Sequence, residues 1–61
     1  MVIIISITQA KDGTFMVVWS DNGKQYKAYL FNAYHIQQLK DCTNDTCKRA
    51  ALNNGINKIA L

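Results

Sequence analysis

Apolar and polar residues along the first half of the chain form three short runs with the character of β-strands. These runs are residues 2–10 (VIIISITQA), 14–20 (TFMVVWS) and 24–31 (KQYKAYLF). They are rich in β-branched and aromatic residues, and glycine-containing segments separate them. The pattern therefore predicts three antiparallel strands in a meander, joined by the tight turns KDG and DNG.

The second turn is the more strongly specified of the two. Asn22-Gly23 predicts a two-residue type I′ turn, because both central positions need a positive φ and these residues adopt it with least strain. Counting outward from this turn places Trp19 opposite Tyr26, and the other pairs of the hairpin follow.

The first turn allows two readings. A two-residue turn at Asp12-Gly13 would place Thr8 opposite Val17. The alternative is a three-residue loop formed by KDG, which would shift every pair of this hairpin by one residue.

Period-two alternation sorts the strand residues onto two faces of the expected sheet. With a two-residue first turn, one face carries Ile4, Phe15, Val17, Trp19, Tyr26, Ala28 and Leu30, and the other carries Ile3, Ile5, Ile7, Met16, Val18 and Tyr29. Both faces are largely apolar, so both need to be covered.

A helical pattern follows the third strand. Asn32 is a suitable N-cap for a short helix that runs to about Lys40. Its inner stripe would contain Ala33, Ile36 and either Leu39 or Lys40.

A second helix is expected after an interruption at residues 41–42. Thr43 can cap this run, NDTCKRAALN, and Asn54-Gly55 is a typical helix stop. Residues 56–61 (INKIAL) alternate again and could add a short fourth strand.

These elements predict one α+β domain over residues 1–61, with a small antiparallel sheet and one or two short helices on one face. Two short helices cannot cover both faces. Either the C-terminal segment folds across the second face, or a partner covers it, and the simplest partner is a second copy in a homodimer.

Composition adds few constraints. Nearly half of the residues are hydrophobic (49%), which is typical of a folded protein, and seven basic residues against four aspartates give a net charge of +3. The opening MVIII is too short for a signal sequence or a membrane span. We therefore expect a cytoplasmic protein with no membrane association.

Few residues suit metal binding or catalysis. His35, Cys42 and Cys47 offer only three ligands in a spacing that matches no common zinc finger, so no metal or other cofactor is expected. We expect the cysteines to pack as small apolar residues, with a disulfide across the helix junction as the alternative. One histidine, no glutamate and no activated nucleophile indicate that the chain is not an enzyme.

Aromatic and apolar residues on the predicted sheet and first helix favour a protein partner. The candidate partner-binding residues are Met16, Val18, Trp19, Tyr26, Tyr29, Tyr34 and Ile36. Aromatic rings near Lys24 and Lys27 also allow nucleic-acid binding, although the lysines are spread over several elements rather than gathered in a stripe.

Residues 21–29 (DNGKQYKAY) resemble a D-x-G-K-Q-Y-x-x-Y segment of the very small phage-encoded inhibitors of uracil-DNA glycosylase. In those proteins too, a hairpin is followed by a short helix, a T-x-D stretch and an ending like NKIAL. The similarity runs from Asp21 to Leu61, and its compact match is Gly23, Lys24, Gln25, Tyr26 and Tyr29.

This resemblance implies a homodimer built by pairing sheets. It also implies a groove of helix and sheet residues that captures a protruding apolar side chain of the enzyme and so occupies its DNA-binding surface. The family is acidic, whereas this chain is basic, with Ala28 near the second tyrosine and neutral helix positions such as Gln37. The scaffold is thus similar, while the target can differ.

The expected function is that of a small, non-enzymatic, phage-type inhibitor in the host cytoplasm. Its target would be a bacterial nucleic-acid-processing enzyme or a defence complex, with uracil-DNA glycosylase as one candidate. The alternative is a small basic nucleic-acid-binding protein.

Overall fold

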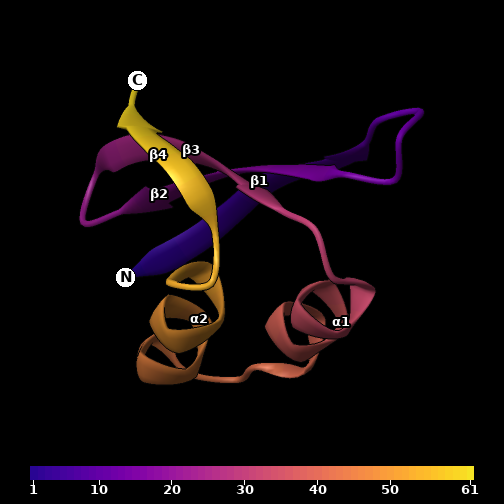
Figure 1. Cartoon of the computed structure of the whole chain (residues 1–61). Coiled ribbons are helices and arrows are strands. Elements are labelled where there is room, and N and C mark those ends of the chain that lie inside the picture. The colour runs from indigo at the N-terminus through magenta and orange to yellow at the C-terminus, as the bar shows by residue number, and fades with distance from the viewer.

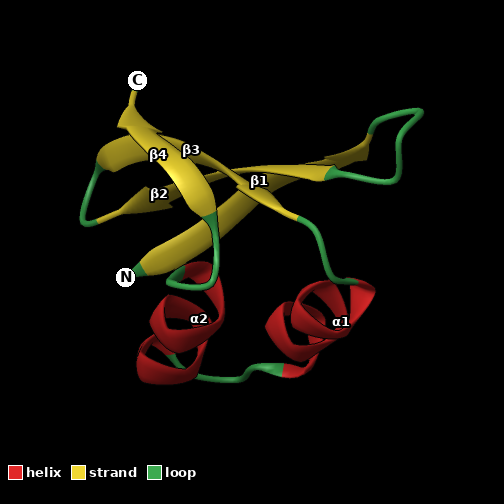
Figure 2. Cartoon of the chain, in the orientation of Figure 1, coloured by secondary structure: helices red, strands yellow, loops and turns green.

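Both helices lie beneath one face of a four-stranded antiparallel sheet (Figure 1). The computed structural model describes residues 1–61. In chain order the elements are β1 (Val2–Gln9), β2 (Phe15–Asp21), β3 (Lys24–Leu30), α1 (Ala33–Asp41), α2 (Asp45–Leu52) and β4 (Ile56–Ala60). The strands lie side by side in the order β1-β2-β3-β4. The predicted α+β class is confirmed, and Figure 2 shows the helices as a separate layer.

The hairpin of β2 and β3 has the predicted turn and register. Asn22 and Gly23 have φ values of 53° and 84°, which are the positive values that a type I′ turn requires. Trp19 pairs with Tyr26, and all seven residue pairs of the hairpin follow the count from this turn.

The hairpin of β1 and β2 has the three-residue loop rather than the two-residue turn. The Ala10 N–H donates to the Thr14 carbonyl at 2.8 Å, which closes the loop formed by residues 11–13. Gly13 has a φ of 89°, the left-handed conformation expected at the last position of such a loop. The Asp12 carboxylate accepts a hydrogen bond from the Thr14 N–H at 2.9 Å and so holds the loop in shape.

The predicted register of this hairpin is therefore wrong by one residue. Thr8 lies opposite Met16, and Val17 instead pairs with Ile7. The prediction assumed that glycine occupied the second position of a two-residue turn, whereas it occupies the third position of a longer loop.

A bulge in β1 also changes which side chains face the helices. The register shifts between Ile4 and Ser6, so Ile5 is an extra residue in β1. As a result Ile4 and Ile7, three residues apart, both pack against the core, and the assignment of Ile7 to the other face was wrong. An insertion of one residue reverses the alternation of all later residues in the strand.

The core lies between the sheet and the two helices. Its buried residues are Val2, Val17, Trp19, Ala28, Leu30, Ile36, Leu39, Ala51 and Leu52. The sheet therefore buries one face only, as two short helices allow.

Helix α1 begins as predicted. The Asn32 side chain accepts a hydrogen bond from the Tyr34 N–H at 2.9 Å, and Ile36 and Leu39 are buried. Ala33 and Lys40 are exposed, so the inner stripe of α1 is narrower than expected.

Helix α2 begins one residue later than predicted. Asn44, not Thr43, is its N-cap and accepts a hydrogen bond from the Cys47 N–H at 2.8 Å. Both residue types cap helices well, and the adjacent asparagine takes the position here. Asp45 follows in the first turn, where a carboxylate is favourable near the helix N-terminus.

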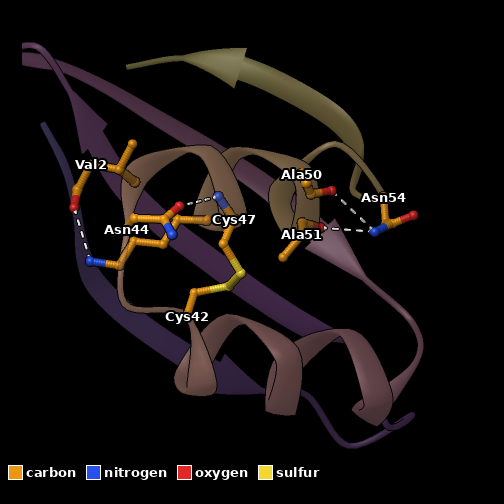
Figure 3. The surroundings of a disulfide bond; sticks show 8 residues. Val2, Cys42, Asn44, Cys47, Ala50, Ala51 and Asn54 are labelled. Atoms are coloured by element: carbon orange, nitrogen blue, oxygen red, sulfur yellow. Dashed lines mark hydrogen bonds between the residues drawn. A yellow bond between two sulfur atoms is a disulfide. The ribbon is translucent and has the colours of Figure 1, made fainter.

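A disulfide joins the end of α1 to the first turn of α2 (Figure 3). Cys42 and Cys47 have their Cα atoms 5.6 Å apart and their sulfur atoms bonded at 2.07 Å. The expectation that both would pack as free thiols was wrong. Cys42 has an extended backbone after Asp41, so the two cysteines do not share one continuous helix.

The C-terminal strand β4 extends the sheet at its β3 edge. Gly55 makes the tight return from α2, because a Cβ at this position would lie 3.0 Å from the Ala28 Cβ. The Leu61 N–H donates to the Gln25 carbonyl at 2.9 Å, which continues the pairing beyond the strand. The predicted fourth strand is confirmed, and it does not cross the second face of the sheet.

An ion pair connects the β2–β3 hairpin to α2. Arg49 donates from Nε and Nη2 to the two carboxylate oxygens of Asp21 at 2.8 and 2.9 Å. The hydrogen bond from Arg49 lowers the pKa of the Asp21 carboxyl below its ordinary value of 3.8. The carboxylate therefore favours the folded state only while it is ionised.

We expect the stability gained from this pair to be present above pH ~4 and lost as the pH falls through the lower, folded-state pKa of Asp21. Urea unfolding midpoints measured from neutral to acidic pH should fall more gently in Asp21→Asn than in the parent. Asp41→Asn is the matched control, because that carboxylate accepts its hydrogen bond from the uncharged Gln37 amide. If the urea midpoint falls with pH equally steeply in Asp21→Asn and in the parent, the ion pair is not the source of this pH dependence.

Candidate protein-binding face

The face of the sheet opposite the helices has no layer packed on it (Figure 2). We call it the open face, and its defining residues are Ile3, Met16, Val18, Lys27, Tyr29, Ile56 and Ile59. Strand pairing and alternation place them there, because directly paired residues share a face and these residues alternate along their strands with residues that point toward the core.

Cross-strand pairing arranges most of the open face in two rows, and Ile3 lies beyond them, opposite Ser20. One row consists of Thr8, Met16, Tyr29 and Ile56, and the neighbouring row consists of Ser6, Val18, Lys27 and Ile59. Each row starts with a small hydroxyl residue on β1 and becomes apolar toward β4. The apolar part therefore spans β2, β3 and β4, with Lys27 as its one charged member.

The apolar side chains of the open face are substantially exposed. Ile3 is 51% exposed and Ile59 is 49% exposed, while Met16, Val18 and Tyr29 are partly shielded by neighbours on the same sheet. Ile5, at the bulge, is exposed to a similar extent. A continuous exposed apolar surface on a small protein is typical of an interaction site.

An irregularity in β4 enlarges this surface. The register shifts between Lys27 and Tyr29, and Asn57 adopts a φ of 54° on the opposite strand. Ile56 and Ile59 are three residues apart, so a regular strand would place them on opposite faces. The shift brings both onto the open face.

One cation lies among these apolar side chains. The Lys27 Nζ is 5.7 Å from the centroid of the Tyr29 ring, within range of a cation–π interaction. Lys27 is the only charged residue in the defined set, so the face combines an apolar area with a single positive charge.

The open face is hollowed at one end. A depression of about 400 Å³ is lined by Ala10, Asp12, Thr14, Met16, Tyr29, Phe31 and Asn57. Met16 and Tyr29 lie in the first row of the open face, and Phe31 is largely exposed beside them. The depression is large enough to receive an apolar side chain from a partner.

The structure separates the predicted partner-binding residues into three groups. Met16, Val18 and Tyr29 lie together on the open face. Tyr34 is 69% exposed but belongs to α1, on the helix side, where its ring meets the edge of His35.

The remaining predicted residues belong to the core side. Trp19 and Ile36 are buried, and Tyr26 is half-buried with its ring stacked 5.7 Å from that of Trp19. Lys58 covers this pair, with its Nζ 4.8 Å from the Tyr26 ring centroid. These three side chains stabilise the monomer rather than present a surface.

Sequence reasoning missed the contribution of β4. Ile56 and Ile59 belong to the open face. The sequence did not determine which strand β4 would pair with, so it did not determine which face of the sheet each of these residues would occupy. The alternation in INKIAL indicated a strand, but nothing in it indicated the shift at Asn57.

The structure also bears on metal chemistry and membranes. Cys42 and Cys47 are consumed in the disulfide, and no three His, Cys, Asp or Glu side chains gather where they could hold a metal ion. None of the helices has the length and apolar character needed to span a bilayer.

The open face combines two largely apolar rows, a single cation and a depression at one end. Such a surface suits burial against another macromolecule. Comparisons of the chain with protein-family models, with curated proteins and with solved structures find no match.

Proposed function

We propose that this protein is a small, non-enzymatic inhibitor that binds a bacterial enzyme or defence complex through its open face. The observation that supports this proposal most directly is the largely apolar surface of β2, β3 and β4, which no part of the chain covers. Burial of this surface against a target would block whatever function the target performs there.

The size of the molecule supports this use of the face. A typical stable interface takes roughly 800 Å² from each partner, which is about a fifth of the 3981 Å² surface of this chain. A sheet face can supply that area as one continuous patch, whereas two short helices separated by a loop offer a more divided surface.

Tyr29 is the expected anchor of the interaction. It lies between Met16 and Ile56 in its row and forms one wall of the end depression. Tyrosine is enriched among the residues that dominate interface energies, because it offers a large rigid area and a hydroxyl. Lys27 beside it would mainly affect the rate of association.

The proposed target is a nucleic-acid-processing enzyme of a bacterial host, acting in the host cytoplasm. This choice is supported by the resemblance of residues 21–29 to the inhibitors of uracil-DNA glycosylase, and that enzyme is the first to be assayed. The absence of the acidic residues of those inhibitors leaves other enzymes and defence complexes as targets.

Tyr29→Ala is expected to reduce target capture by about tenfold or more, because an anchor residue carries a large share of the binding energy. The measurement is affinity capture from bacterial lysate with quantitative mass spectrometry, together with inhibition of purified uracil-DNA glycosylase. Tyr34→Ala is the matched control, since it removes an exposed tyrosine from the helix side. Full capture by Tyr29→Ala, or an equal loss in both variants, would contradict the proposal.

A second copy of the chain is the other protein partner that could occupy the open face. Sedimentation of the parent and Tyr29→Ala at several concentrations measures this self-association directly. If Tyr29→Ala dissociates a dimer while capture of the target is unchanged, the open face serves dimerisation, and the target binds elsewhere.

Nucleic-acid binding is the second candidate function, and one observation favours it. Lys27 and Tyr29 place a cation beside a partly exposed ring on the open face, which is suitable for phosphate contact and base stacking. Nuclease treatment of half of the lysate distinguishes the two functions. Retention of one enzyme in both halves supports the inhibitor, whereas loss after digestion supports nucleic-acid binding, which should also weaken steeply with salt.

A further inference from the structure

The outer strand β1 is an edge of the sheet that carries a bulge at Ile5 but no charge. Its sequence VIIISITQ contains no charged residue and is the longest strand of the four. The opposite edge, β4, is shorter, carries Lys58 and contains the irregular residue Asn57. Charges and irregularities are the usual means of preventing further strand pairing, and β1 lacks the charges.

Helix α2 covers only the beginning of this edge. The Val2 N–H donates to the Asp45 carboxylate at 3.1 Å, and the Val2 carbonyl accepts from the Lys48 Nζ at 3.5 Å. Both backbone groups of Val2 therefore point away from β2 and are satisfied by side chains of α2.

The backbone groups further along β1 point outward without such partners. Alternation from Val2 makes Ile4 the next outward residue. At the other end, the Ala10 N–H faces Thr14 in the first hairpin, so Ile7 and Gln9 point outward. The edge thus offers the N–H and C=O groups of Ile4, Ile7 and Gln9 to an added strand.

A groove runs beside this edge on the helix side. It has a volume of about 450 Å³ and is lined by Met1, Val2, Ile3, Ile4, Ile7, Leu39, Lys40, Cys42, Asp45 and Lys48. Most of its lining is apolar, and its cations are Lys40, Lys48 and the N-terminal ammonium of Met1, which lies 3.6 Å from the Asp45 carboxylate. Its one carboxylate, Asp45, is already engaged by the Val2 N–H.

We propose that the β1 edge and this groove bind an extended acidic segment of a partner protein as a fifth strand. Backbone hydrogen bonds would form at Ile4, Ile7 and Gln9, and one apolar side chain of the segment would enter the groove against Leu39. Acidic side chains of the segment would lie near Lys40 and Lys48. This site is separate from the open face, and it does not depend on the function proposed for that face.

The charges favour such a segment over a second copy of the chain. Antiparallel pairing of two β1 strands about a two-fold axis normal to the sheet places both helix layers on the same side. The two grooves would then adjoin, and Lys40 and Lys48 of both copies would face each other. Like charges brought together in this way oppose pairing, whereas an acidic strand neutralises them.

Selection from a displayed library of random octapeptides tests the proposal. We expect enrichment of peptides that alternate β-branched residues with aspartate or glutamate. When an enriched peptide is added as a synthetic, labelled compound, hydrogen exchange of the Ile4, Ile7 and Gln9 amides should slow, while exchange in β4 should not change. Failure to enrich any peptide, or protection in β4 instead of β1, would overturn the proposal.

Charge reversal gives the matched pair of variants. Lys40→Glu should weaken binding of the selected peptide by about tenfold. Lys24→Glu, on β3 and separated from the β1 edge by β2, carries the same charge change and should bind as the parent does. If both variants weaken peptide binding equally, the binding reflects general attraction between a basic protein and an acidic peptide. That result would overturn the proposed site. Tyr29→Ala should bind the peptide as the parent does, because Tyr29 lies on the open face. The peptide test therefore remains valid even if the function proposed for the open face is wrong.

Discussion

Replacing Leu30 with alanine is expected to lower the free energy of unfolding by about 3 kcal/mol. Leu30 is 1% exposed and lies on the inner face of β3, so the substitution leaves a cavity between the sheet and the helices. A single core in a chain of this size rarely supplies more than about 3 to 5 kcal/mol. We therefore expect Leu30→Ala to be largely unfolded at room temperature, as measured by circular dichroism and urea titration.

Ile59→Ala is the control for this prediction. Ile59 is on a strand too, but it is 49% exposed on the open face, so its truncation should change the free energy of unfolding by roughly 0.5 kcal/mol or less. A comparable loss in the two variants would mean that the open face is buried in solution, and would point to self-association.

Loss of the disulfide is expected to have the second-largest effect on stability. Cys42 and Cys47 are five residues apart, and closing so short a loop in the unfolded chain is worth roughly 2 kcal/mol in the chain-entropy model. The double variant Cys42→Ser, Cys47→Ser should thus unfold about 15 °C lower than the parent, given the size of the chain.

Calorimetry with and without a reductant checks this prediction. The reductant should lower the midpoint of the parent to that of the double variant and should leave the variant unchanged. A parent whose midpoint is insensitive to reductant would show that the bond contributes nothing. Because the cytoplasm keeps most thiols reduced, the same comparison estimates the stability that the proposed inhibitor would retain there.

The two hairpins show which parts of the fold were predictable from sequence. Asn22-Gly23 determines a single turn type, so the count from it gave every pair between β2 and β3. Gly13 is compatible with two loop lengths, and only the packing of Ile7 against the core distinguishes them. The bulge at Ile5 lies within a run of isoleucines, where a change of face leaves no trace in the hydrophobic pattern.

The helix region was predictable in its elements but not in its details. Asn32, Ile36 and Leu39 have the expected roles. The disulfide was underrated because residues five apart point away from each other in one unbroken helix, whereas α1 ends at Asp41 and the extended backbone of Cys42 brings its sulfur to Cys47. A similar ambiguity applies to the cap of α2, where Thr43 and Asn44 are adjacent.

The candidate site was predicted in part. Met16, Val18 and Tyr29 were assigned correctly to an uncovered face, because their register depends only on the second hairpin. Trp19 and Tyr26 are equally aromatic, but alternation directs them to the helix side, where they stack. Aromatic character alone therefore does not distinguish a binding residue from a core residue in so small a sheet.

The stacked position of Trp19 gives the molecule an internal optical probe. Trp19 is the only tryptophan, it is 3% exposed, and its ring lies beside the Tyr26 ring and the Lys58 ammonium. Indole emission shifts to longer wavelength when water reaches the ring, so its spectrum reports the integrity of the core. A ligand on the open face has the whole sheet between itself and this ring. Binding there should thus leave the emission maximum unchanged, while loss of the fold shifts it to the red.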